Sequence, residues 1–489
     1  MGEEVRHTSY SRAHRQAYRL KVQRCLDVFE TMLAESSFEF DKPLTGMEIE
    51  CNLVDADYQP AMSNQEVLAS IADPAYQTEL GAYNIEFNVP PRPLPGRTAL
   101  ELESEIRASL NAAETKAGTD GAHIVMIGIL PTLMPEHLTG SWMSPSMRYQ
   151  ALNDSIFTAR GEDMLIDIAG TEHLSIHAES IAPESACTSM QLHLQVSPAD
   201  FASNWNAAQV IAAPQLAMGA NSPYFFGRQL WSETRIELFA QATDTRPDEL
   251  KAQGVRPRVW FGERWITSIF DLFEENVRYF PTLLPEISEE DPVAELAAGR
   301  TPLLPELRLH NGTVYRWNRP VYDVVNGRPH LRVENRVLPA GPTVIDMMAN
   351  SAFYYGLLRT ISEEDRPLWT KISFAAAHDN FLEAARKGMG ARLYWPGLGE
   401  VSADELVLRR LLPMADEGLR RWRVAADVRD RYLGVIEGRA KTGRNGATWQ
   451  VDTVHKLEGR GLGRSDALAE MLRRYCDLMH SNEPVHTWQ

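Results

Sequence analysis

The sequence predicts an α+β fold followed by a helical C-terminal section. Patterns of strands and helices alternate up to about residue 340, and almost only helical patterns follow from about residue 343. Four of the expected strands alternate apolar residues with charged or amide residues, which places each kind on its own face. These four segments are 46–50, 83–89, 190–196 and 331–337.

The N-terminal half gives the clearest element boundaries. Apolar residues at helical spacing predict a helix over 10–38, and a shorter helix is expected over 62–72. The strand over 83–89 ends at Pro90, because proline cannot donate to a strand ladder. The other expected elements are a strand over 46–54, an amphipathic helix over 97–117, a buried strand over 123–128, a strand over 189–197 and an Ala-rich helix near 199–219.

The C-terminal half begins with a less regular region. Residues 281–305 are rich in Pro, Glu and Gly, which predicts a mobile insertion. Strands are expected after it at 313–317 and 330–338. The best helical segments that follow are 343–360, 366–387, 402–437 and 464–480.

Composition and charge limit the classes of protein to consider. The 489 residues are 44% apolar and 24% charged, as in soluble globular proteins. The net charge of −17 argues against a nucleic-acid-binding surface, which needs a basic footprint. The four cysteines lie far apart without a CxxC pair, and no apolar run reaches the length of a membrane span. We therefore expect a soluble protein of the reducing cytoplasm.

The polar faces of the expected strands gather residues that suit a cation and a phosphate. Glu48 and Glu50 share one face of the first strand, and Glu86 and His193 lie on the corresponding faces of later strands. Carboxylates repel one another, so their gathering predicts a hard divalent cation such as Mg²⁺. Such a cation often also binds a phosphate group, and arginines are well suited to bind the same phosphate. The last strand supplies Arg332, Glu334 and Arg336.

Each of these patterns also has an ordinary structural explanation. The paired glutamates could form a solvated strand edge, and a lone strand histidine is more often structural than a ligand. The Arg–Glu–Arg triplet could be a self-contained ion-pair ladder. Arg316 and Arg319 flank Trp317, which suits anion or purine contacts but also a surface stack. The motifs GxxxxGK[ST], GxGxxG, GxSxG and HExxH, which would indicate other active sites, are absent from the sequence.

Taken in order, these residues resemble the glutamate–cysteine ligase family, which includes bacterial carboxylate–amine ligases and belongs to the glutamine-synthetase-like superfamily. The resemblance rests on the G-x-E-x-E opening at 46–50, the Glu79 and Glu86 pair, His193 and the strand at 333–336. It implies a curved antiparallel β-sheet, packed with helices, whose concave face is the active site. The implied organisation is an N-terminal helical segment over 1–43, a glutamine-synthetase-like catalytic core over 44–342 and a helical C-terminal section over 343–489.

The resemblance also implies roles for single residues. Two or three Mg²⁺ ions, with Mn²⁺ as an alternative, would be held by Glu48, Glu50, Glu79, Glu86, His193 and Glu334. Arg336 is expected to face the transferred phosphoryl group, Arg235 to hold the α-carboxylate of glutamate, and Arg316 to contribute to catalysis. ATP, as co-substrate, would contact Arg332, Arg319 and Asn335.

The reaction implied by the resemblance is ATP-dependent amide formation. A carboxylate of glutamate would attack the γ-phosphate of ATP to give an acyl phosphate, and an amine would then displace phosphate. Cysteine is the expected acceptor, which would place the enzyme in glutathione biosynthesis; another amino acid, an amine or ammonia is the alternative. An acyl phosphate must be sheltered from water, so 221–235, 285–305 and 438–450 are expected to supply a lid.

Two other classes of protein compete with a ligase. A guanidine kinase of the same superfamily would transfer phosphate without making an amide, and a binding protein could keep the sheet without turnover. The complete set of acidic residues argues against a binding protein, because a protein that no longer needs to catalyse a reaction could lose buried acids that are costly to keep. No nucleic-acid or membrane partner is expected, and the sequence leaves the oligomeric state open.

Overall fold

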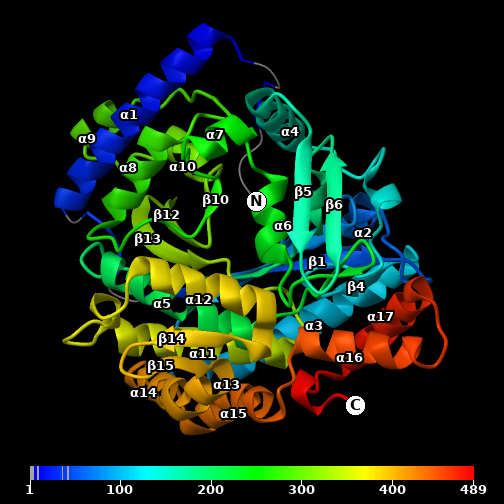
Figure 1. Cartoon of the computed structure of the whole chain (residues 1–489). Helices are drawn as coiled ribbons and strands as arrows, with labels where there is room; N and C mark the ends of the chain where they lie inside the picture. The colour runs from blue at the N-terminus through cyan, green and yellow to red at the C-terminus, as the bar shows by residue number, and fades with distance from the viewer. Residues whose placement is uncertain (1–4, 8–9, 36, 41–42) are drawn as a thin grey trace.

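The central feature of the computed structural model, which describes residues 5–7, 10–35, 37–40 and 43–489, is one curved sheet. Within these residues seven strands form the sheet, and every neighbouring pair is antiparallel (Figure 1). Its order is β12 (Asn318–Val325), β13 (Arg328–Asn335), β7 (Met190–Val196), β1 (Thr45–Val54), β3 (Asn84–Arg92) and β2 (Tyr76–Thr78), with β4 (His123–Val125) also on β1. The predicted α+β class is confirmed.

The register of the sheet brings residues that are far apart in sequence onto one face. Glu50 on β1 lies opposite Glu86 on β3, and Glu334 on β13 lies opposite His193 on β7. Neighbouring residues on the same strands point to the other face and are fully buried: Ile49, Ile85, Leu192 and Val333. The alternation expected from the sequence is therefore confirmed, with the acids on the concave face.

Two long helices support the back of the sheet. The side chains of α5 (Phe201–Gly219) and α11 (Val344–Ser362) are buried on almost every side. Trp205 on α5 donates its indole N–H to the Asn318 carbonyl of β12 at 2.9 Å. Tyr355 on α11 donates its hydroxyl to the His193 carbonyl of β7 at 3.0 Å. These bonds attach the helices directly to strands that carry the polar face.

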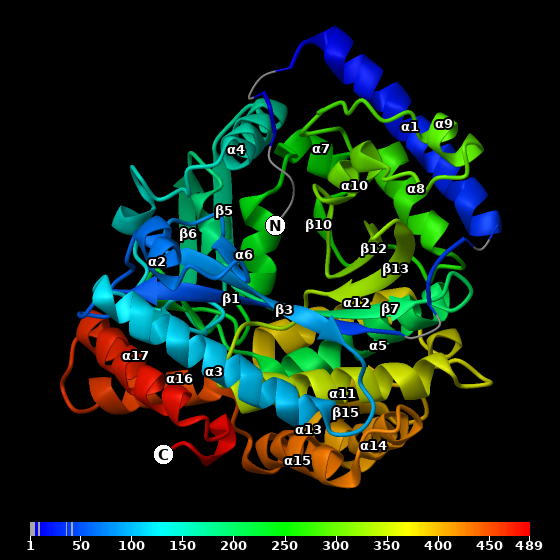
Figure 2. The ribbon, with the colours of Figure 1, turned by 180° about the vertical axis from the view of Figure 1, so that it is seen from behind.

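The C-terminal section adds a further helical layer behind α11 (Figure 2). Its elements are α12 (Phe374–Lys387), β14 (Arg392–Trp395), β15 (Gly399–Ser402), α13 (Ala403–Leu406), α14 (Leu412–Arg421), α15 (Ala426–Thr442), α16 (Gly446–Glu458) and α17 (Arg464–Ser481). Helices α11 and α14 meet at Gly356 and Gly418, where a Cβ on either glycine would overlap the backbone of the other helix. Arg439 of α15 forms a fully buried ion pair of 2.7 Å with Asp346 of α11.

The concave side is enclosed by two groups of elements. On one side lie α4 (Met147–Arg160), the hairpin of β5 (Met164–Ala169) and β6 (His173–Ala178), and α6 (Arg235–Ala242) (Figure 2). On the other side, α1 (Arg12–Ala34) packs on α8 (Ile269–Tyr279), α9 (Pro292–Ala297) and α10 (Pro305–Asn311). Lys21 of α1 pairs with the buried Glu306 of α10 at 3.1 Å. The remaining helices of eight or more residues are α2 (Asn64–Ile71) and α3 (Thr98–Thr119), which pack together beside β3 and β4.

Several element boundaries differ from those expected. The region 281–305 contains α9, whose first turn is capped by the Asp291 carboxylate through Val293 N at 3.1 Å. The helix expected over 402–437 is broken between α14 and α15, because Arg423 takes a left-handed φ of 59° there. Helices α13 and α14 are joined without a break by a π-helical turn, Val407–Leu411. The loop expected over 438–450 is mostly helical, since only three residues separate α15 from α16.

The N-terminal segment is described only in part. The helix expected over 10–38 corresponds to α1, while residues 1–4, 8, 9, 36, 41 and 42 of the predicted segment 1–43 lie outside the described residues. Of the helices in the part of the chain that is described, none combines the length and the apolar character needed to cross a membrane.

The close crossing of α11 and α14 should not tolerate a side chain. We expect Gly418→Ala to destabilise the protein by about 1–3 kcal/mol, the usual cost of overpacking, because the added Cβ meets the carbonyl of Gly356. Gly434→Ala is the matched control, since it lies in α15 with open space around its Cβ position and should stabilise the helix by up to about 1 kcal/mol. Urea denaturation followed by circular dichroism would measure both changes. Equal effects of the two substitutions would contradict this packing.

Candidate active site

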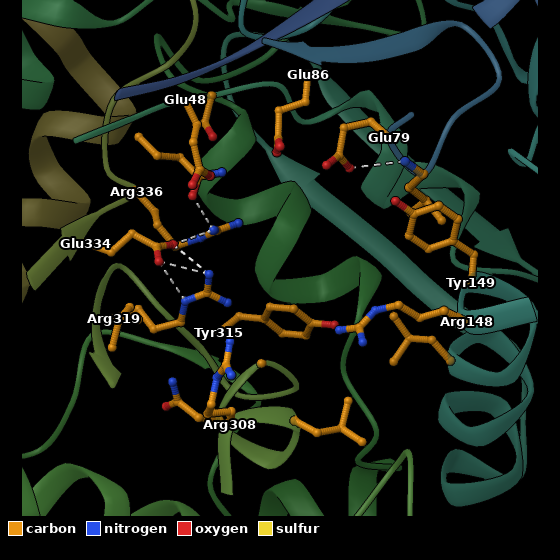
Figure 3. A pocket seen from close by; sticks show the side chains of 18 of the residues that line it. Glu48, Glu79, Glu86, Arg148, Tyr149, Arg308, Tyr315, Arg319, Glu334 and Arg336 are labelled. Carbon is orange, nitrogen blue, oxygen red and sulfur yellow. Dashed lines mark hydrogen bonds and ion pairs between the residues drawn. The ribbon is translucent and has the colours of Figure 1, made fainter. Parts of the chain in front are cut away.

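A cavity of about 440 Å³ lies on the concave face of the sheet. Figure 3 shows Glu48, Glu79 and Glu86 along one side of it, and Arg319 and Arg336 on an adjoining side. The volume falls in the range of small-molecule sites, which combine a concave shape with a few converging polar groups. The cavity therefore has an acidic wall and a basic wall that face a shared space.

Three carboxylates converge on the acidic wall. Glu50 comes from β1, Glu86 from β3, and Glu79 from the turn that joins β2 to β3. One oxygen from each lies within 4.8 Å of the others. Burial, opposed by Arg336 and reinforced by Glu86, raises the pKa of Glu50 above its ordinary value. Burial and repulsion by the other two acids raise the pKa of Glu79 well above its ordinary value.

The backbone and amide groups around Glu50 hold its carboxylate in a fixed orientation. Ser189 donates its backbone N–H to one oxygen at 2.5 Å, and Gln191 donates its side-chain amide to the other at 2.8 Å. Glu86 accepts from the Asn88 side chain at 2.7 Å. Three converging acids with oxygen ligands fit a hard divalent cation such as Mg²⁺ or Mn²⁺. Glu50, Glu79 and Glu86 are therefore the residues that would hold one.

Glu48 and His193 form a second group beside the three acids. Glu48 Oε1 lies 3.0 Å from His193 Nε2. Burial acts to raise the pKa of Glu48, but contact with His193 lowers it to about 2. On the other side of the ring, Arg332 donates its Nε–H to His193 Nδ1 at 3.2 Å, so the ring proton belongs on Nε2, toward Glu48. Nδ1 of His193 therefore has a hydrogen-bond partner, whereas Nε2 lies close to Glu48 but makes no hydrogen bond among the described residues.

Two arginines neutralise Glu334. Arg319 Nη2 and Arg336 Nη1 lie 2.8 Å and 2.7 Å from Glu334 Oε1. Burial acts to raise the pKa of Glu334, but the two guanidinium groups lower it well below its ordinary range. Of the six predicted metal ligands, the structure therefore brings Glu50, Glu79 and Glu86 together and places the other three in pairs with basic side chains.

The predicted arginines divide between the cavity and the packed interior. Arg332, Arg319 and Arg336 line the cavity. Arg235 also reaches it, with its guanidinium stacked 5.6 Å above the Trp317 ring. Arg235 pairs with Glu233 at 3.1 Å and donates to the Arg336 carbonyl at 3.3 Å and to the Val337 carbonyl. Each guanidinium nitrogen thus makes one bond, and the second N–H of each terminal nitrogen is left for a ligand.

The structure corrects the expected placement of Arg316 and Asn335. Arg316 pairs with Glu275 of α8 at 3.0 Å and does not line the cavity, because it lies in β11 (Tyr315–Arg316), which pairs with β10 (Val259–Trp260) outside the curved sheet. Asn335 is one residue beyond Glu334 and so points to the opposite face, where its amide donates to Asn318 at 2.9 Å. Both residues are almost fully buried and support the sheet.

Several polar cavity residues were not found from the sequence, among them Arg148, Tyr149, Glu184 and Arg308. Arg148 and Tyr149 come from the first turn of α4, Glu184 from a short turn before β7, and Arg308 from α10 (Figure 3 labels the first, second and fourth). Arg308 pairs at 2.9 Å with Asp323, which also pairs with Arg332 at 3.1 Å. These residues lie on helices and turns outside the alternating strands, so no periodic pattern marks them.

Comparison with known proteins adds the family. The profile of Glutamate-cysteine ligase family 2 (GCS2) matches residues 44–476, which is most of the chain. The protein belongs to this family. Membership makes it a carboxylate–amine ligase, a class of enzymes that use ATP. The expected resemblance to glutamate–cysteine ligases is confirmed. No curated protein sequence matches the chain.

Solved structures support the same fold. The glutamate–cysteine ligase gshA of Francisella tularensis, determined in complex with AMP, is similar over 91% of this chain and 91% of its own, with a TM-score of 0.57 and 12% identity. A bifunctional glutathione synthetase from Pasteurella multocida is similar over 93% of this chain and 55% of its own, with a TM-score of 0.52 and 10% identity. The predicted curved sheet with a helical C-terminal region is therefore confirmed at the level of the fold.

The three converging acids should make stability depend on divalent cations. We expect Mg²⁺ or Mn²⁺ to raise the melting temperature of the wild-type protein, by an increment that corresponds to about 2.7 kcal/mol at a cation concentration 100 times Kd. Glu79→Gln should be more stable than wild type without cation, because it removes one repulsive charge, and should gain much less when cation is added. Thermal melts across a cation titration would measure both effects.

The matched control for this test is Glu437→Gln, which changes an exposed acid of α15 that pairs with Lys441. It should keep the full increment from the cation. If Glu79→Gln gained as much as wild type, Glu79 would not be a ligand.

Proposed function

We propose that this protein forms a γ-glutamyl amide bond, with glutamate as the activated acid and cysteine as the acceptor. Family membership supports the ligase class, and the cavity supplies the groups that such a reaction needs. The observation that carries the proposal is the meeting of three convergent acids with a wall of arginines in one cavity. Such a site accepts a cation and the anionic groups of ATP and glutamate together.

The proposed first step forms an acyl phosphate. A side-chain oxygen of glutamate attacks the γ-phosphorus of ATP, the bond to the β-γ bridging oxygen breaks, and ADP leaves. Arg336 would face the transferred phosphoryl group, a role supported by its place on the cavity wall, where Arg319 pairs with the same Glu334. A bound divalent cation would supply charge neutralisation for the phosphates. Arg332 and Arg308, both held by Asp323, offer further donors for anionic groups.

The proposed second step is attack by the acceptor amine on the acyl carbon, with release of phosphate. Arg235, stacked on Trp317, would bind the α-carboxylate of glutamate through its remaining donors. Cysteine is our choice of acceptor because the matching family takes its name from the glutamate–cysteine reaction. All four cysteines of the chain are free, which agrees with a reducing cytoplasm as the site of the reaction.

Phosphate release would test this proposal directly. The purified protein is given ATP, Mg²⁺ and L-glutamate with a panel of amino acids, amines and ammonia, and products are identified by mass spectrometry. We expect glutamate-dependent release with cysteine and formation of γ-glutamylcysteine. Release with a different amine would keep the ligase and replace the acceptor. Phosphate transfer to a guanidine compound, or no release with any acceptor, would overturn the proposal.

Arg336 should matter mainly in the transition state. We expect Arg336→Ala to lower kcat/KM by about 10²–10³-fold, as removal of one donor from a developing negative charge does in other enzymes. Arg328→Ala is the matched control, because Arg328 also belongs to β13 but is largely exposed and does not line the cavity. Steady-state kinetics with all three substrates would measure the change. A loss below threefold, with the fold intact, would remove Arg336 from this role.

A further inference from the structure

One acid of the cavity has no part in the cation group or in the arginine pairs. Glu184 lines the cavity from a 3-10 turn, Ala182–Ala186, that precedes β7. Its Oε2 atom is buried and, among the described residues, has no hydrogen-bond partner. A buried oxygen without a partner costs free energy, so it needs an explanation.

The turn that carries Glu184 is fixed in place on both sides. Ser185 donates its hydroxyl to the Ala182 carbonyl at 2.7 Å and lies 3.0 Å from the Tyr83 hydroxyl. Ile181, fully buried, donates its backbone N–H to the Asn153 side chain at 3.1 Å. Because these bonds hold the backbone, the carboxyl group of Glu184 is presented to the cavity from a rigid support.

The charged neighbours of Glu184 place it beside the reacting groups. Arg336 and Glu50 are the two charged side chains whose fields reach its carboxyl group most strongly, one from each wall of the cavity. The carboxyl group also acts electrostatically on Tyr149 of α4, Tyr315 and Cys187, which line the same space. Glu184 is therefore within electrostatic reach of both the cation group and the arginine that would face the phosphoryl group.

The second step of the reaction has a proton to dispose of. An acceptor amino group with an ordinary pKa near 8 is largely protonated at neutral pH, and an ammonium group has no lone pair with which to attack. Glu50, Glu79 and Glu86 would be occupied by a cation, Glu48 lies against His193, and Glu334 is paired with two arginines. The other acids of the cavity wall are also paired: Glu286 with His7, Glu306 with Lys21, and Asp323 with two arginines. Burial raises the pKa of Glu184 to about 8, close to that of the amine from which it would take a proton.

We propose that Glu184 is the general base that deprotonates the acceptor amine, an inference that rests on the proposed ligase function. The ammonium N–H of the acceptor donates to Glu184 Oε2, and the proton moves to that oxygen. The freed lone pair of the nitrogen forms the C–N bond to the acyl carbon, the C–O bond to phosphate breaks, and the second proton lost from the nitrogen leaves on the departing phosphate. The carboxylic acid of Glu184 then returns its proton to solvent as the products leave.

Hydroxylamine separates this role from the rest of the reaction. It captures acyl phosphates as hydroxamates and is largely unprotonated at neutral pH, so it needs no base. In Glu184→Gln we expect kcat with cysteine to fall by about 10²–10⁴-fold, the usual contribution of general base catalysis. Formation of γ-glutamyl hydroxamate from ATP, glutamate and hydroxylamine should stay within about threefold of wild type, which would also show that the variant folds and makes the acyl phosphate.

Two further variants sharpen the test. Glu179→Gln changes an exposed acid five residues earlier, outside the cavity, and should leave both reactions unchanged. Glu184→Asp keeps the carboxylate and should recover part of the cysteine reaction. Equal losses with cysteine and hydroxylamine in Glu184→Gln, or no loss with cysteine, would overturn the role of Glu184. Failure of the wild-type protein to form the hydroxamate would instead overturn the proposed function, and the inference with it.

Discussion

The close approach of Glu50, Glu79 and Glu86 is the constraint on which the rest of the cavity depends. Three buried oxygens within 4.8 Å repel one another, and the repulsion is strong because little water screens it. The strands hold two of these acids in direct register, and the fully buried Ile49 and Ile85 anchor the same strands from the opposite face. Packing of the sheet against α5 and α11 thus holds together acids whose repulsion a bound cation would relieve.

Only some of the acidic side chains of the cavity are neutralised by basic side chains of the protein. Glu334 is compensated by two arginines, so its charge is cancelled within the protein, and Glu48 lies against the His193 ring. Among the described ion pairs, neither Glu50 nor Glu79 of the three convergent acids is paired with a basic side chain. On the basic wall, the single negative charge of Asp323 pairs with two positive charges, those of Arg308 and Arg332. The result is one region with excess negative charge and one with excess positive charge, which suits a cation shared with phosphate groups.

The sequence predicted the parts of the site that lie on regular strands. Alternation alone places Glu48, Glu50 and Glu334 on one face, and the same alternation explains why Asn335 points away. Glu184 and the α4 residues occupy a turn and a helix start, whose side-chain directions follow no strand period. Arg316 sits one residue before Trp317 and β12, and its partner Glu275 is on α8, so only the tertiary structure reveals that this arginine is structural. The division of the long C-terminal helix depends on a single left-handed residue, Arg423.

The two charged regions are connected through one neutral side chain. Gln191 donates its amide to Glu50 at 2.8 Å and accepts from Arg336 at 2.6 Å with the oxygen of the same amide. An amide suits this place because it is both donor and acceptor, and because it adds no charge to either region. A carboxylate there would add repulsion to Glu50, and a cation would repel Arg336. Through Gln191, the orientation of an acid that would bind the cation is coupled to that of the arginine that would face the phosphoryl group.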